Sequence, residues 1–168
     1  MSDNPRIAEN QQERLDVNWL VGFTDGEGCF SISFVKNNEL RFGYQIFLEF
    51  VITQGERSLT ALEKVRNCFG VGKIYINRRY DNHKENIYRY CVRNRKDLLS
   101  VICPFFQKHQ LVTDKKSDFE IFYRVAQMME RNEHLTKQGF EQIKELASGT
   151  NRQKKRLESS TTARQNRP

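Results

Sequence analysis

The sequence lacks the features of a membrane-spanning, secreted or zinc-binding protein. None of its apolar runs approaches the roughly 18 residues that a membrane span needs, and the N-terminus has no basic segment followed by an apolar one, as a signal peptide would. The cysteines form no CxxC pair and no zinc-ligand spacing with a histidine; they are Cys29, Cys68, Cys91 and Cys103. We therefore expect a soluble, unprocessed protein whose four thiols are buried in a reducing compartment.

Two common catalytic patterns are also missing. The histidines His83, His109 and His134 fall in a predicted turn or near helix ends, with no serine or cysteine partner implied, which argues against histidine-driven nucleophilic catalysis. The segment 70–73, Gly-Val-Gly-Lys, lacks the full GxxxxGK[ST] spacing of a phosphate-binding loop and precedes a predicted strand, so we interpret it as a turn.

Positive charge, in contrast, is in excess and is concentrated in two segments. The formal charge is +7 and the isoelectric point is near 9.3. Residues 73–97 carry eight basic and three acidic side chains, and residues 151–168 carry six basic and one acidic, so each segment has a charge of +5 and the remainder sums to −3. This asymmetry favours a polyanion such as nucleic acid as partner, although a basic surface can also serve solubility alone.

Hydrophobic periodicity predicts one folded unit of the α+β class between two irregular ends. We expect residues 1–12 to be a flexible arm, residues 13–150 to be the domain, and residues 151–168 to be a basic flexible tail. The domain is predicted to have the order αββαββα followed by further helices. The predicted helices cover 18–25, 57–69, 96–107, 116–130 and 136–147, and the predicted strands cover 29–36, 44–54, 73–80 and 87–93. A turn at Asn37-Asn38 joins the first two strands.

An antiparallel sheet of this order has one face covered by helices and one face open. Alternation along the strands places polar and aromatic residues on the open face: Ser31, Ser33, Gln45, Thr53, Lys73, Tyr75, Asn77 and Arg79. A two-stranded ribbon fits the major groove of DNA, and the basic hairpin 73–93, with Arg89, would add charge against phosphates. An ordinary solvated face is the alternative. The tyrosines Tyr75, Tyr80, Tyr88 and Tyr90 suit base stacking, yet in hairpins such residues more often cover the core.

The segment 19–30, WLVGFTDGEGCF, combines a short apolar helix, two acids and an immediate strand. It resembles the LAGLIDADG motif of homing endonucleases, with which residues 20–28 align without a gap, although Glu27 stands where many members have aspartate. Gly22 and Gly26 are four residues apart on one helical face, so two such helices are able to approach closely. The expected dimer interface is Leu20, Val21, Gly22, Asp25 and Gly26.

Glu27 at the end of each paired helix is the candidate ligand of a hard divalent cation, together with the carbonyl oxygen of Gly26. We expect Mg²⁺, or another divalent cation such as Mn²⁺ or Ca²⁺. The sequence contains one such motif, because residues 111–125 have acids but no pair of small residues on one face. A symmetric homodimer is the simplest way to complete the site.

Two further segments resemble the family's catalytic region. Gln54 ends the segment 49–54, EFVITQ, where the resemblance implies a glutamine that orients water. The segment 111–119 resembles the lysine-bearing segment before the next long helix, with Lys115 the first candidate and Lys116 the second for stabilising charge on the phosphate. Arg57 and Ser58 are weaker candidates for an accessory group.

The resemblance implies an enzyme that cuts both strands of DNA at a long pseudo-palindromic site and leaves short 3′ overhangs. Two open sheets would form a saddle over the DNA. It also implies a mobile-intron or intein origin, often in an organelle genome of a mitochondrion or chloroplast. An RNA-binding maturase that assists intron splicing and a DNA-binding repressor without catalysis are the alternatives, and intact Glu27 and Gln54 favour cleavage.

Overall fold

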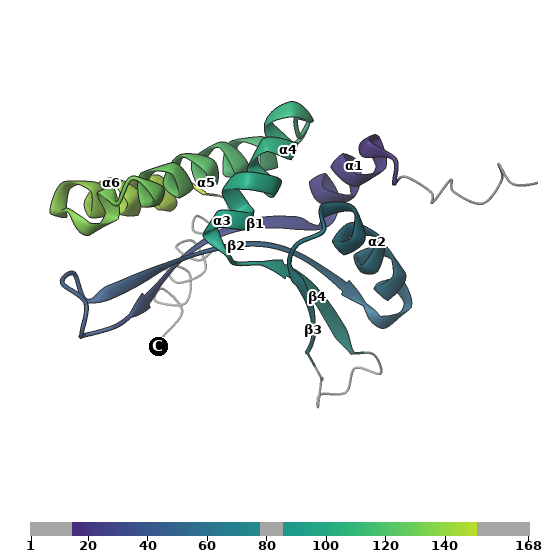
Figure 1. The fold of residues 1–168 in the computed structure, drawn as a ribbon, viewed down its shortest axis with the longest axis horizontal. Helices are drawn as coiled ribbons and strands as arrows, with labels where there is room; N and C mark the ends of the chain where they lie inside the picture. Colours follow the sequence, from purple (N-terminus) through teal and green to yellow (C-terminus); the bar gives the residue numbers. More distant parts are fainter. Residues whose placement is uncertain (1–14, 78–85, 151–168) are drawn as a thin grey trace, which may run out of the picture.

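A four-stranded antiparallel sheet forms the framework of the protein, in a computed structural model that describes residues 15–77 and 86–150. The strand order is β1-β2-β4-β3. The strands are β1 (Gly28–Lys36), β2 (Tyr44–Gly55), β3 (Lys73–Asn77) and β4 (Ile87–Val92). Phe30 of β1 lies opposite Phe50 of β2, which in turn lies opposite Val92 of β4. The sheet arches, and none of the helices formed by residues 15–77 and 86–150 lies on its concave face (Figure 1).

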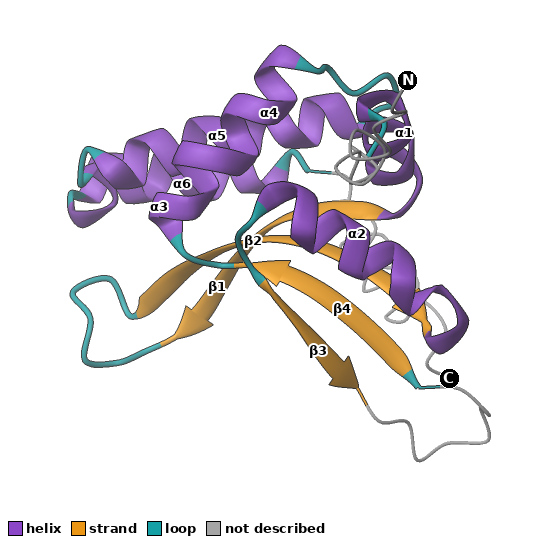
Figure 2. Ribbon diagram, turned by 45° about the vertical axis from the view of Figure 1, so that its right-hand side comes forward, coloured by secondary structure: helices purple, strands orange, loops and turns teal. Residues whose placement is uncertain are grey.

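The helices in the described part of the chain lie on the convex side of this sheet (Figure 2). In chain order they are α1 (Val17–Glu27), the 3-10 turn η1 (Glu56–Ser58), α2 (Leu59–Phe69), α3 (Arg95–Asp97), the π-turn η2 (Leu98–Ile102), α4 (Cys103–Lys108), α5 (Lys115–Glu130), the 3-10 turn η3 (Glu133–Leu135) and α6 (Lys137–Ser148). The predicted α+β order αββαββα with appended helices is therefore confirmed. No helix among these described residues has the length and apolar character required to cross a membrane.

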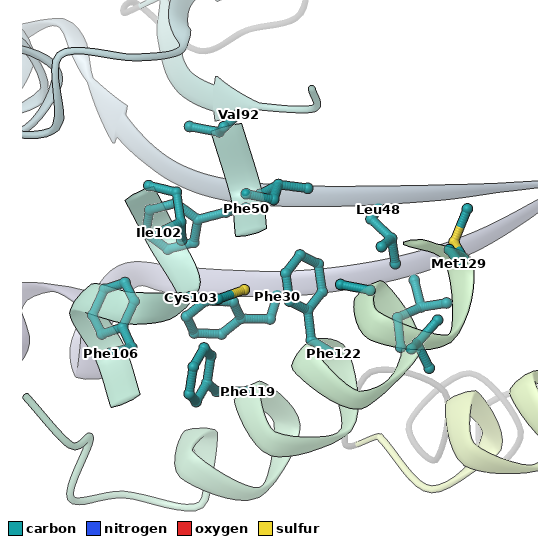
Figure 3. Close-up of a cluster of buried hydrophobic side chains, with 14 of the residues drawn as sticks. Phe30, Leu48, Phe50, Val92, Ile102, Cys103, Phe106, Phe119, Phe122 and Met129 are labelled. Atoms are coloured by element: carbon teal, nitrogen blue, oxygen red, sulfur yellow. The ribbon is translucent and has the colours of Figure 1, made fainter. Parts of the chain in front are cut away.

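The core lies between the sheet and the helices and is rich in phenylalanine (Figure 3). Phe30 of β1 is its centre, because its ring lies 5.0 Å from that of Phe50, 5.4 Å from Phe106 and 5.1 Å from Phe119, measured between centroids. The sheet and the helices α4 and α5 are thus joined through one side chain. Burial of these aromatic surfaces is the main stabilising contribution to the fold.

The loop between β1 and β2 covers residues 37–43, between the predicted strand bounds; the Asn37 N–H donates to the Gly43 carbonyl at 2.9 Å, and Gly43 has a φ of +71°. One predicted element differs from the structure. The single helix expected over 96–107 is divided by the π-turn η2. Pro104 has no N–H to donate to the carbonyl of Ser100, which interrupts the regular α-helical ladder at this point.

The four thiols are not equally buried. Cys91 and Cys103 are buried, and burial raises the pKa of Cys103 to about 12. Cys29 is half-buried, however, and Cys68 is exposed on α2, so the expectation of four buried thiols is wrong. Cys68 lies beside the buried stripe of α2, which is formed by Leu62, Val65 and Phe69, rather than in it. The predicted arm 1–12 and tail 151–168 lie outside the described residues.

Candidate active site and nucleic-acid interface

The acidic end of α1 passes directly into β1 without a loop. Glu27 is the last residue of the helix and is exposed, and Gly28 begins the strand. A side chain at Gly28 is sterically impossible, because a Cβ there would lie 2.6 Å from the methyl carbon of Thr24 and 2.7 Å from its carbonyl oxygen. The glycine that closes the motif therefore lets the chain turn from helix to strand, and it holds the Glu27 carboxylate at the junction.

Asp25, the first acid of the motif, connects α1 to the segment before α5. Its carboxylate accepts hydrogen bonds from the Val112 N–H at 2.8 Å, the Thr113 N–H at 3.2 Å and the Thr113 hydroxyl at 2.8 Å. Burial alone would raise the pKa of Asp25, but these hydrogen bonds together outweigh burial and lower the pKa below its ordinary value. The carboxylate is therefore ionised at neutral pH and is engaged within its own chain, although Asp25 was expected at a dimer interface.

The two candidate lysines have different surroundings. The Lys115 ammonium donates to the Thr24 carbonyl at 3.0 Å, whereas the Lys116 ammonium donates to the Gln110 side chain at 2.9 Å. Burial lowers the pKa of Lys115, and nearby groups oppose this effect. Those groups are the Cys29 sulfur and the carboxylates of Asp25, Glu27 and Asp118. Of the two lysines, Lys115 is thus the one at the acidic end of α1.

Gln54 lies at the same end of the sheet as Glu27. β1 begins at Gly28, which pairs with Ile52, and β2 continues past this pair to Gly55. Gln54 is therefore about 7 Å further along the strand, beyond the start of β1, and it is half-buried. Arg57 and Ser58 follow in the 3-10 turn, where Arg57 is exposed and Ser58 is half-buried.

The oxygens at this site suit a hard divalent cation. Glu27 offers a carboxylate and the exposed Gly26 a backbone carbonyl, and Mg²⁺ is commonly held by one or two carboxylates with water and phosphate oxygens completing its shell. Within residues 15–77 and 86–150, no cluster of three or more His, Cys, Asp or Glu side chains is able to hold a metal.

The outer face of α1 is open at its glycines. Gly22 and Gly26 are exposed, and a Cβ at either position would meet nothing within 4 Å. Val21 is half-buried, while Leu20 has no exposed surface and packs in the core of its own chain. Leu20 was expected at a dimer interface, but burial makes its side chain inaccessible to a second chain.

The concave face of the sheet carries the residues expected there. Register places Ser31 opposite Glu49 and Tyr75 opposite Arg89. The strand register places the other expected residues on this same face: Ser33, Gln45, Thr53, Lys73 and Asn77. Arg79 lies outside the described residues. The tyrosines divide between the faces as well: Tyr75 is exposed, whereas Tyr90 is buried and donates its hydroxyl hydrogen to the Val71 carbonyl at 2.8 Å.

Three residues of interest were not among the candidates from sequence. Trp19 is 40% exposed on α1 and stacks on Phe23 with ring centroids 4.8 Å apart. Glu49 and Arg93 lie on the concave face and form an ion pair. The alternation of side chains along a strand places Arg93 on the same face as Arg89, four residues earlier. No sequence pattern indicated that Arg93 and Glu49 are in contact.

The helix α1, the arched sheet and the long helix α5 together form the fold of the LAGLIDADG homing endonucleases. The profile of the LAGLIDADG endonuclease family matches residues 20–126, and the chain belongs to this family. A probable intron-encoded DNA endonuclease 1 of Mycosarcoma maydis is 34% identical over 133 residues, which are 79% of this chain and 45% of that protein. An uncharacterised 50.9 kDa protein in ND4 intron 1 of Podospora anserina is 36% identical over 125 residues, 73% of this chain and 26% of that protein.

Solved structures of homing endonucleases share the fold. I-TnaI has a TM-score of 0.72 at 39% identity, covering 86% of this chain and 97% of that chain. I-SmaMI bound to cleaved DNA has a TM-score of 0.73 at 31% identity, covering 83% of this chain and 45% of that chain. I-SmaMI has also been solved with uncleaved DNA target in the presence of calcium ions, with a TM-score of 0.74 at 30% identity and coverages of 89% and 49%. The chain spans less than half the length of the curated relatives it matches.

Proposed function

We propose that this protein is a site-specific endonuclease that hydrolyses both strands of a DNA duplex with a divalent cation, as a homodimer. The observation that carries the proposal is the junction of α1 and β1, where an exposed Glu27 lies near the half-buried Lys115 ammonium. A carboxylate is able to hold a metal and an ammonium group is able to stabilise negative charge on a phosphate, so this pair of charges suits phosphodiester hydrolysis. Relatives named as endonucleases support this function.

Two copies of the chain are proposed because one copy has one Glu27. Cutting two strands requires a metal-binding acid at each of two phosphates, and paired α1 helices would bring two Glu27 carboxylates together. Gly22 and Gly26 support such a pairing, since their open outer surface permits close approach of a second helix. The lengths agree: this chain matches 97% of I-TnaI but 45% of the I-SmaMI chain bound to cleaved DNA, so two copies would match one such longer chain.

Each residue of the site is assigned one task in this proposal. Glu27 and the Gly26 carbonyl would hold a divalent cation, whose chemistry would be to polarise the phosphate and to lower the pKa of water. Gln54 orients the attacking water through its side-chain amide. Lys115, rather than Lys116, stabilises negative charge on the phosphate, because its ammonium is already held beside the acidic end of α1. Arg57 and Ser58 remain candidates for accessory contacts at the end of β2.

DNA binding is assigned to the concave face of the sheet. Lys73, Arg89 and the other polar residues of this face, namely Ser31, Ser33, Gln45, Tyr75 and Asn77, would contact base edges and phosphates in the major groove. Arg79 is retained as a DNA contact from its sequence position. The DNA-bound relatives support a duplex as the partner. An origin in an intron of an organelle genome is part of the proposal, and relatives named as intron-encoded support it.

The function is tested by incubating the full chain with a library of duplex DNA in Mg²⁺ or in EDTA and sequencing the ends produced. We expect discrete ends at one pseudo-palindromic sequence in Mg²⁺, with staggered cuts on the two strands, and none in EDTA. Ends that form equally in EDTA would contradict metal dependence. If the protein produces no ends but retains a structured intron RNA, the maturase becomes the better assignment.

The two lysines give a matched pair of variants. Lys115→Met is expected to slow cleavage of bound DNA by roughly 10²–10³-fold, the effect of removing one preorganised charge from a transition state. Lys116→Met removes the same charge one residue further on, where the ammonium binds Gln110, and is expected to change the rate by a few-fold at most. Single-turnover rates with saturating protein measure both. If both variants lose the same fraction of the cleavage rate, the two lysines contribute only to the net positive charge of the protein, and Lys115 has no specific role.

A further inference from the structure

An acidic side chain, Glu49, lies in the middle of the concave face, among polar and basic residues and the exposed apolar Phe47. Glu49 of β2 accepts a hydrogen bond from Arg89 Nη2 on its Oε1 at 2.7 Å, and one from Arg93 Nε on its Oε2. The Glu49 side chain is 16% exposed, against 35% for Arg89 and 55% for Arg93. The carboxylate is therefore shielded beneath two guanidinium groups that reach the surface.

Arg93 is also held in place from a second side. The guanidinium carbon of Arg93 lies 5.5 Å from the centre of the Tyr75 ring, close enough for a cation–π contact. Tyr75 in turn is the strand partner of Arg89. A guanidinium has five N–H groups, so one hydrogen bond from each arginine to Glu49 leaves several donors on each. Side chains of β2, β3 and β4 thus form one cluster that presents donors in fixed directions.

We propose that Glu49 is a positioning residue that fixes Arg89 and Arg93 as readers of guanine in the major groove. This inference rests on the proposed function, because it assigns base recognition to the DNA-binding face. Arginine recognises guanine through two parallel hydrogen bonds to O6 and N7, which require a definite orientation of the guanidinium. A freely rotating arginine binds any phosphate, whereas one held by a carboxylate keeps its orientation and has less net charge to offer a phosphate.

The position of the cluster predicts where along the target the guanines lie. Glu49 is opposite Ser31, three residues along β1 from Gly28 at the catalytic end. This separation is about 10 Å at the rise of a β-strand. At about 3.4 Å for each base-pair step, a ribbon that follows the groove would read guanine about three base pairs from the cut phosphate.

The experiment compares the base preferences of four proteins. Wild type, Glu49→Gln, Arg93→Ala and Glu141→Gln are each used to select bound sequences from a randomised duplex library with Ca²⁺ as the cation. Glu141→Gln is the control, because it also removes one negative charge and one ion pair, here with Lys144 at 3.3 Å. Both residues lie on α6, on the helical side of the sheet (Figure 2). Affinity for a random-sequence duplex and the melting temperature are measured for each protein.

We expect wild type and Glu141→Gln to select guanine at one or two positions in each half-site. Glu49→Gln should reduce that preference by roughly tenfold, the discrimination of one two-bond contact. Its affinity for random DNA should be equal or higher, and its preferences elsewhere unchanged. Arg93→Ala should lose guanine at one of the same positions. The melting temperature should change little, since partly exposed ion pairs contribute little to stability.

The outcomes distinguish this inference from the function on which it rests. A wild-type consensus that Glu49→Gln leaves unchanged, or loses evenly at all positions, would overturn the role of Glu49 while preserving sequence-specific binding. Loss of guanine with Glu49→Gln but not with Arg93→Ala would overturn the assignment of base reading to Arg93. If wild type selects no consensus at all, the site-specific nuclease and this inference both fail.

Discussion

Replacing Glu27 with Gln is expected to abolish cleavage in Mg²⁺ while leaving DNA affinity nearly unchanged. Glutamine keeps the size of the side chain but removes the charge that a hard cation requires. The cation supplies several kcal/mol of transition-state stabilisation, so its loss should slow cleavage by about 10³-fold or more. Binding should persist because the concave face of the sheet is unaltered, and the exposed position of Glu27 means that the fold loses no internal contact.

The measurement is the single-turnover cleavage rate in Mg²⁺, together with the dissociation constant for the same duplex in EDTA. Glu63→Gln is the matched control, because Glu63 is exposed on α2 and loses the same charge. If the Glu27→Gln protein cuts at the wild-type rate, metal binding has to be assigned to residues other than Glu27. Loss of affinity in EDTA equal to the loss of rate would make Glu27 a binding residue.

Replacing Gly22 with Gln is expected to prevent the proposed pairing of two chains while slightly stabilising the single chain. Gly22 is exposed in the middle of α1, and a Cβ there meets nothing within 4 Å, so glutamine fits the chain without strain. Glutamine is also the better helix former, which should add about 0.5 kcal/mol to the free energy of unfolding of one chain. Between two closely packed helices, the added side chain from each copy should weaken association about a hundredfold or more.

Sedimentation of the protein with and without target DNA, and the ratio of double-strand cuts to nicks, test this prediction. Thr60→Gln provides the control. Thr60 is exposed on α2, so this substitution also raises helix propensity, but in a helix other than α1. We expect Thr60→Gln to associate and cut as wild type does. A Gly22→Gln protein that remains dimeric and cuts both strands would contradict pairing through α1.

The sequence by itself predicted the class and order of the fold. Alternation of apolar residues at every second position identified the strands, and it separated the face of Phe30 from that of Ser31, because neighbouring residues of a strand point to opposite faces. The motif around Glu27 was recognisable because its helix, glycines and acids are contiguous. Such features depend on residues a few positions apart, which the local backbone places in a fixed relation.

The tertiary structure decided which residues meet across long stretches of chain. Asp25 accepts hydrogen bonds from Val112 and Thr113, 87 and 88 positions away. Lys115 rather than its neighbour reaches the Thr24 carbonyl, 91 positions away. One residue changes the direction of a side chain on a helix by about 100°, and the rotation of α5 against α1 is set by packing around Phe30, so adjacent lysines were indistinguishable in sequence.

Glu49 is the third such case. Arg89 lies in β4 and Arg93 directly follows it, 40 and 44 positions away, so their pairing with Glu49 depends on the register of β2 against β4. Leu20 is the reverse case: the motif placed it on an interface, and the core of its own chain encloses it. Hydrophobic pattern determines which faces are buried, and only the assembled sheet and helices determine which partners cover them.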